Sequence, residues 1–117
     1  DALEIYRTVY ICEGAINAET LGENGIATGG KAVSRWQVNK FIKSPVEKFI
    51  ILIDPDAKDK ALDLAFKLVP FKKVKVVFLP DNEDVNSLGK QRTLEYVRKT
   101  TYQTYQELLS IKSQLKI

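Results

Sequence analysis

Acidic residues follow three of the apolar stretches in this 117-residue chain. They are Glu13, then Asp54 and Asp56, and then the group Asp81, Glu83 and Asp84. Carboxylates that are crowded together repel one another unless a cation neutralises them, and Mg²⁺ or Mn²⁺ with oxygen ligands does so. Mg²⁺ in such sites contacts substrate phosphates, so the pattern favours phosphoryl transfer or phosphodiester cleavage. A separate acid, Glu13, could move a proton.

The sequence around these acids alternates between short β-type runs and helical periodicity. It predicts strands over 8–12, 25–28, 48–53 and 74–79, helices over 15–21, 33–42 and 56–69, a polar loop over 81–89, and one long helix from 90 onward. Strands that alternate with helices form a parallel sheet, and ligands bind beyond the carboxyl ends of its strands. We therefore expect the acids to share one sheet edge. A single Asp can instead open a turn or cap a helix, as Asp56 could.

The composition excludes several classes of protein. The chain is 44% hydrophobic and 28% charged, which indicates one globular domain. It has no histidine, so Ser-His-Asp, Cys-His and His-ligated zinc chemistry are excluded within it. The single cysteine, Cys12, indicates a reducing, cytoplasmic setting, and the longest apolar run, 49–53, is too short to cross a membrane. The first residue is Asp rather than Met, so we expect a piece excised from a longer chain.

The charge is unevenly distributed along the chain. Residues 1–89 carry 12 Lys and Arg against 13 Asp and Glu, whereas residues 90–117 carry 6 against 2. A mildly basic tail is compatible with nucleic-acid binding, but the interpretation we favour is a solvated helix face.

The segment 25–32 comes within one residue of a phosphate-binding P-loop. Its last position is Ala32 where the motif needs Ser or Thr to bind Mg²⁺. The first glycine of the motif should also follow a strand, yet Gly25 begins one. We therefore interpret the segment as a strand and a turn rather than as a nucleotide site.

Three motifs in order resemble a Toprim domain, the metal-binding domain of bacterial-type primases, topoisomerases, certain nucleases and recombination-mediator proteins. They are Glu13-Gly14 after the first strand, Thr28-Gly29-Gly30 after the second and Asp54-Pro55-Asp56 after the third. The segment 76–89, with Leu79-Pro80 before a polar acidic loop, is most similar to DnaG-type DNA primases of bacteria and phages. Ala57-Lys58 departs from the Ala-Gly that follows the motif in many primases, and Asn86 stands where many have a second acid.

The resemblance implies an α/β three-layer sandwich, Rossmann-like, with a four-stranded parallel sheet in the order 2-1-3-4 and a C-terminal helix. It implies that Glu13 is the general acid or base and that Asp54, Asp56 and Asp84 hold Mg²⁺ or Mn²⁺. Phosphates would lie near Gly14, Gly29, Gly30 and Lys31. Residues 1–89 would form the Toprim core and residues 90–117 a helical extension.

The implied function is that of the catalytic Toprim core of a bacterial or phage DNA primase. Such a core makes RNA primers by Mg²⁺-dependent nucleotidyl transfer, with template DNA, nucleoside triphosphates and a replicative helicase as partners of the parent protein and little activity by itself. Two alternatives stay open: a Toprim nuclease of the OLD or maturation-ribonuclease type, and a non-catalytic DNA-binding module of a recombination protein.

The remaining conspicuous side chains are predicted to be structural. We expect Trp36 to pack in the core through an apolar helix face, and Cys12 to face the core. Tyr102 and Tyr105 lie outside the Toprim region and are not expected to act as nucleophiles. Arg35 lies near the Gly-Gly turn, where it could meet phosphates or solvent equally well.

Overall fold

A computed structural model describes residues 2–28, 33–53 and 57–116 of the chain. Its centre is a parallel four-stranded sheet in the order β2-β1-β3-β4, as expected. The strands are β1 (Thr8–Cys12), β2 (Gly25–Ala27), β3 (Lys48–Ile53) and β4 (Lys73–Phe78). In the central register, Ile11 pairs with both Ile26 and Ile51, and Ile51 pairs with Val76. All four strands therefore end at the same edge of the sheet.

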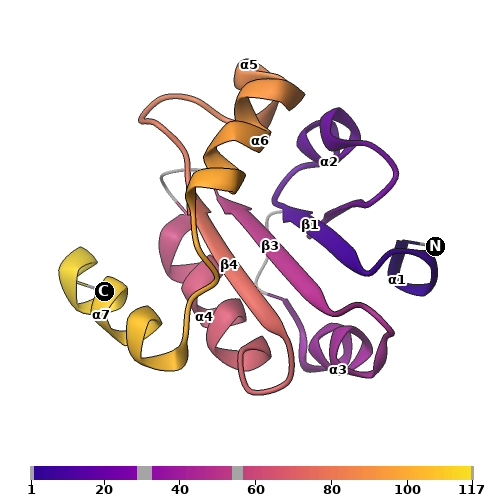
Figure 1. Cartoon of the computed structure of the whole chain (residues 1–117), viewed down its shortest axis with the longest axis vertical. Coiled ribbons are helices and arrows are strands. Elements are labelled where there is room, and N and C mark those ends of the chain that lie inside the picture. Colours follow the sequence, from indigo (N-terminus) through magenta and orange to yellow (C-terminus); the bar gives the residue numbers. More distant parts are fainter. Residues whose placement is uncertain (1, 29–32, 54–56, 117) are drawn as a thin grey trace.

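Helices cover both faces of the sheet and make the three layers (Figure 1). The helices are α1 (Ala2–Ile5), α2 (Ala15–Leu21), α3 (Arg35–Lys43), α4 (Lys58–Leu68), α5 (Val85–Leu88), α6 (Lys90–Lys99) and α7 (Tyr105–Leu115). Helices α1, α3, α4 and α7 share one hydrophobic cluster with the sheet, and α2, α5 and α6 share the other. No helix within the described ranges is long and apolar enough to span a membrane.

The central strand β3 is predicted to the residue because it is apolar on both faces. Phe49 and Ile51 are buried toward α3 and α4, and Ile50 and Leu52 are buried toward the helices of the opposite face. A strand covered on both sides is a nearly continuous apolar run, as this one is. The motif 54–56 follows this doubly covered strand in the sequence and lies outside the described residues.

The long C-terminal helix predicted from residue 90 is wrong, because the chain breaks into α6 and α7 around residues 100–104. The connector runs beside β4 (Figure 1) and pairs with its outer edge. The Gln103 N–H donates to the Val74 carbonyl at 3.0 Å, and the Gln103 side-chain amide bonds both the N–H (2.7 Å) and the carbonyl (3.2 Å) of Val76. An edge strand leaves such groups unpaired, so this connector satisfies them where a continuous helix could not.

Two further short helices, α1 and α5, were not expected.

We expect Gln103→Leu to lower the free energy of unfolding by about 2 kcal/mol, because the partly buried N–H and carbonyl of Val76 lose their partner. The matched substitution Gln106→Leu, at an exposed position of α7, should change it by less than about 0.5 kcal/mol. Urea unfolding of the two variants checks the prediction. Equal stability would mean that the connector does not protect the β4 edge.

The predicted burial of Trp36 is also wrong, since the side chain is 70% exposed on α3. The buried face of α3 is set by Val38 and Phe41, which pack against the sheet. Trp36 and Phe41 are five residues apart, or about 140° around a helix, and cannot share that face. The Trp36 ring instead lies 5.5 Å from the Lys40 ammonium. Cys12 is buried, as expected.

Candidate functional site

The junction between β1 and β3 is the switch point of the sheet. After β1 the chain turns into α2 on one face, and after β3 it turns into α4 on the other. Ligand sites of open parallel sheets lie at such a crevice, beyond the carboxyl ends of the strands. Glu13 directly follows β1 at this crevice. Asp54 and Asp56 follow β3 in sequence and lie outside the described residues.

A small pocket of about 40 Å³ opens at this edge, and Glu13, Thr28 and Lys60 supply its polar lining. Its walls are apolar side chains at the ends of β1 and β3 and on the first turns of α4, among them Cys12, Leu52 and Ala61. Thr28 fixes the rim, because its N–H donates to the Cys12 carbonyl at 2.9 Å. Glu13 is partly exposed, so its carboxylate can meet both solvent and a ligand. Thr28 belongs to the motif 28–30 of the sequence analysis, whereas Lys60 joins the site only through the fold, and no sequence pattern indicated it.

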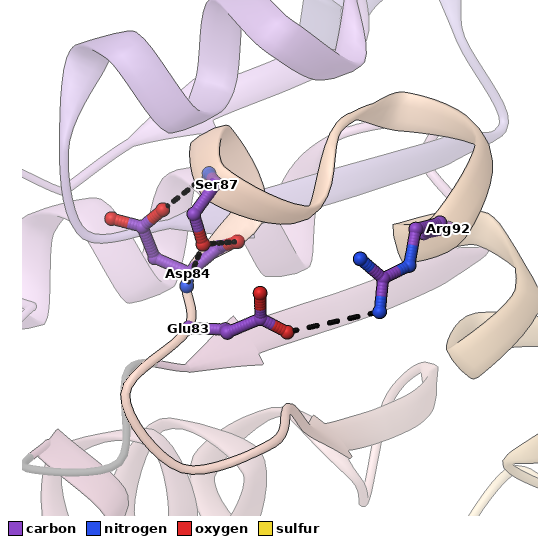
Figure 2. A network of polar contacts seen from close by, with 4 residues as sticks. All are labelled: Glu83, Asp84, Ser87 and Arg92. Atoms are coloured by element: carbon purple, nitrogen blue, oxygen red, sulfur yellow. Dashed lines mark hydrogen bonds and ion pairs between the residues drawn. The ribbon is translucent and has the colours of Figure 1, made fainter.

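Asp84 begins the short helix α5 as its N-cap (Figure 2). Its carboxylate Oδ1 accepts the Ser87 N–H at 2.8 Å, and the Ser87 hydroxyl accepts the Asp84 N–H at 2.9 Å. The neighbouring Glu83 forms an ion pair with Arg92 at 3.9 Å. A carboxylate can cap a helix through one oxygen while the other oxygen binds a cation, so the capping role leaves the predicted ligand role of Asp84 possible. A helix-capping role, which the sequence analysis considered for Asp56, is thus the role that Asp84 has in the structure.

A buried asparagine joins the segments that carry Glu13 and Asp84. The Asn17 side chain is 8% exposed, and its Oδ1 accepts the Asn86 N–H at 3.0 Å. Asn17 lies one helical turn after Glu13, and Asn86 lies two residues after Asp84. The Asn86 side chain accepts a hydrogen bond from Thr20 at 3.5 Å, so it faces α2. Asn17 was not among the predicted site residues, although a polar residue on the buried face of α2 was an available signal.

Gly14 leaves the backbone beside Glu13 open. Its φ is −103°, and a Cβ built on it would meet nothing within 4 Å. Neither backbone conformation nor packing therefore requires a glycine at this position. A ligand could approach the main chain closely there, as the predicted phosphate contact requires.

Comparison with solved structures identifies the fold. The chain superposes on the zinc-binding and RNA polymerase domains of the Aquifex aeolicus primase with a TM-score of 0.69 and 25% identity over 92% of this chain. It superposes on a DNA primase domain from Pseudomonas aeruginosa with a TM-score of 0.68 and 22% identity over 83% of this chain. It also superposes on a DnaG primase catalytic domain bound to single-stranded DNA, with a TM-score of 0.68 and 20% identity over 83% of this chain. The chain has the Toprim fold of these primases.

The Toprim match covers a part of each primase. It takes in 31% of the Aquifex aeolicus chain, 34% of the Pseudomonas aeruginosa chain and 36% of the chain bound to DNA, so this chain spans about a third of their lengths. No protein-family model matches the sequence, and no curated protein matches it either.

The donor chemistry at this Toprim edge suits a hard cation. Glu13 and Asp84 offer carboxylate oxygens from two joined segments, and such oxygens are the ligands that Mg²⁺ and Mn²⁺ prefer. Within the described ranges no group of three or more His, Cys, Asp or Glu side chains could hold a metal ion. The proposed Asp54 and Asp56 ligands lie outside those ranges, as do the predicted phosphate contacts Gly29, Gly30 and Lys31.

Proposed function

We propose that this chain is the catalytic Toprim core of a bacterial or phage DNA primase, which makes RNA primers by Mg²⁺- or Mn²⁺-dependent nucleotidyl transfer. The observation that carries the proposal is a parallel sheet with the fold of primase catalytic domains, in which Glu13 directly follows β1 at the β1–β3 switch point. Template DNA, nucleoside triphosphates and a replicative helicase would be partners of the parent protein. The likeness to a primase solved with single-stranded DNA supports the first of these.

Each site residue has a role in this proposal. Glu13 would take the proton from the attacking hydroxyl as general base, from a partly exposed position on the pocket rim. Asp54, Asp56 and Asp84 would hold the metal, which when bound neutralises charge on the triphosphate. Gly14 would let the triphosphate approach the main chain, with Gly29, Gly30 and Lys31 on the neighbouring turn.

We further propose that residues 1–89 carry the chemistry and that residues 90–117 brace it. Val97 of α6 is buried on one face of the sheet, and Leu108 of α7 is buried on the other. The extension therefore packs against both layers of the core. It also supplies the connector that covers the β4 edge.

Ribonucleotide incorporation on a single-stranded DNA template, with Mg²⁺ or Mn²⁺, tests the function. The proposal expects slow, metal-dependent synthesis by this chain. Metal-dependent cleavage of DNA or RNA without nucleotides would instead indicate a Toprim nuclease. DNA binding that does not respond to metal, with neither reaction, would indicate a non-catalytic module.

Thermal melting tests the metal site separately. Metal that binds only the folded state stabilises it by RT ln(1 + [L]/Kd), or about 1.4 kcal/mol at ten times Kd. In a domain of this size we expect Tm to rise by roughly 5 °C, and more with Mn²⁺. The rise should vanish in Asp54→Asn and Asp56→Asn, and Asp54→Asn should leave the metal-free protein at least as stable because one repelling charge is gone.

Asp59→Asn is the matched control for the metal experiment, because Asp59 is exposed on the first turn of α4. It should keep the full rise in Tm at constant ionic strength. Equal rises in the wild type and in all three variants would mean non-specific ion effects, and the metal site at this edge would then be rejected.

A further inference from the structure

The sheet has two edges, and described residues cover one of them. The α6–α7 connector pairs with the outer side of β4 (Figure 1), whereas β2 forms the opposite edge and pairs with β1 alone. The Asn24 carbonyl accepts the Tyr10 N–H at 2.9 Å, and the Thr28 N–H donates to the Cys12 carbonyl at the same distance. Because backbone groups alternate along a strand, the N–H and carbonyl of Ala27 point away from β1. No described strand lies on that side of β2.

A groove of about 370 Å³ runs along this open edge, between α1 and α3. Leu3 of α1, Ile26 of β2 and Phe41 of α3 give it an apolar lining. Trp36 lines it as well, and its side chain is 70% exposed. We call the Ala27 edge and these four side chains the β2 groove. An exposed tryptophan beside an apolar hollow is the kind of residue that anchors a partner.

The charges around the β2 groove are unequal. Helix α3 carries three exposed cations and no acidic residue; the cations are Arg35, Lys40 and Lys43. Among the described residues that line the groove, Glu23 is the one acid, and its carboxylate accepts the Tyr6 hydroxyl. The side of the groove formed by α3 is therefore positive and attracts acidic groups.

We propose that the β2 groove binds an extended acidic segment of another protein, which adds a strand to the open edge of the sheet. The Ala27 N–H and carbonyl pair with the backbone of this segment, and one of its apolar side chains packs against Trp36. Side chains of a strand alternate between its two faces, so carboxylates at every second position face the cations of α3. The segment contacts none of the residues assigned to nucleotidyl transfer.

Two other occupants suit the β2 groove less well. A nucleic acid has no peptide groups with which to continue the sheet, so it would leave the Ala27 N–H and carbonyl without strand partners. A second copy paired through the same edge would bring two α3 helices to one interface. Each helix carries three exposed cations, and like charges placed together oppose association.

Fluorescence anisotropy with a labelled peptide of about ten residues, the length of a long strand, tests the proposal. The peptide alternates Thr with Leu or Asp, and the buffer contains EDTA and no nucleotide, so the result does not depend on the proposed function. We expect binding that weakens as salt is added. Trp36 is the one tryptophan of the chain, so its fluorescence should shift to shorter wavelength as the peptide covers the ring.

Two modified peptides test the mode of binding. The same peptide with Lys in place of Asp should bind about tenfold more weakly or worse, because its charges face the cations of α3. N-methylation of alternate backbone amides, made in each of the two registers, should weaken binding about tenfold in one register alone. The amides of that register are the ones that pair with β2.

Protein variants separate the ring from the charge. Trp36→Ala should weaken binding about tenfold and Trp36→Phe only a few-fold, and both should keep the wild-type Tm because the ring is exposed. Lys40→Gln should weaken binding about threefold and make it less sensitive to salt. Lys99→Gln is the matched control and should change neither, because Lys99 is an exposed lysine that also lies over an aromatic ring, that of Tyr96, on the other layer.

Four results would overturn the proposal. The first is no binding of the Asp peptide, and the second is equal binding of the Asp and Lys peptides. The third is a dimer of the chain alone, seen by sedimentation and lost in Trp36→Ala, which would assign the β2 groove to a second copy. The fourth is binding of oligo-dT that depends on Trp36 and displaces the peptide, which would assign the groove to nucleic acid.

Discussion

Gly25→Ser is expected to lower the free energy of unfolding by about 3 kcal/mol, which corresponds to a fall in Tm of roughly 12 °C. A Cβ at Gly25 would lie 2.3 Å from the carbonyl oxygen of Ala18 and 3.0 Å from its carbonyl carbon. These are backbone atoms of α2, so no side-chain rotation can relieve the overlap. Either the helix or the edge strand β2 must move.

Gly14→Ser is the matched control for this change. A Cβ at Gly14 meets no atom within 4 Å, and its φ of −103° with ψ of 153° suits a serine N-cap. The variant should therefore be as stable as the wild type or slightly more so. Thermal and urea unfolding of both variants check the pair. A Gly25→Ser protein as stable as Gly14→Ser would mean that α2 does not pack on β2 this closely.

The same contact explains the first glycine of the segment 25–32, which is similar to a phosphate-binding loop. The glycine that opens the pattern begins β2, as expected, and its missing side chain lets α2 approach the strand. Because α2 follows Glu13 and Gly14 directly, a shift of this helix would also move the candidate site. Close packing thus accounts for Gly25 without a bound nucleotide.

The strands could be predicted well from the sequence because strands that are buried consist mainly of apolar residues. β3 is apolar on both faces, and Glu13 follows a strand that is bounded just as clearly. The sheet order came from the Toprim resemblance, since a parallel order depends on contacts distant in sequence. The site edge then followed from the direction of the strands.

Features that depend on neighbours distant in sequence were missed. The predicted helix was extended through residues 100–104 from the apolar positions on either side of them, yet Gln103 pairs with the open edge of β4, and that edge exists only in the folded sheet. Trp36 is apolar but lies off the face that Val38 shares with the core. The hydrogen bond from the Asn86 N–H to Asn17 joins helices far apart in the sequence, so the polar residue on the buried face of α2 could be noticed locally but its partner could not.

The largest effect on activity is expected from Glu13→Gln, which should lower ribonucleotide incorporation by about 10²- to 10⁴-fold, the usual contribution of a positioned general base. Glutamine keeps the shape of the side chain and removes its negative charge together with its ability to take a proton. Glu13 lines the pocket at the switch point and is partly exposed, so the substitution should not disturb the packing of the fold. The free energy of unfolding should stay within about 0.5 kcal/mol of the wild type.

Two readouts distinguish the base from a metal ligand. If Glu13 acts as the base, Glu13→Gln keeps the rise in Tm with Mn²⁺ while losing synthesis; if Glu13 is a ligand, both fall together. Glu19→Gln, at an exposed position of α2, is the matched control and should keep both synthesis and the rise in Tm. Synthesis by Glu13→Gln at the wild-type rate would remove Glu13 from the chemistry. The proton would then have to leave through another group at the same edge, and Asp84, whose Oδ1 is held by the Ser87 N–H, would be the next carboxylate to test.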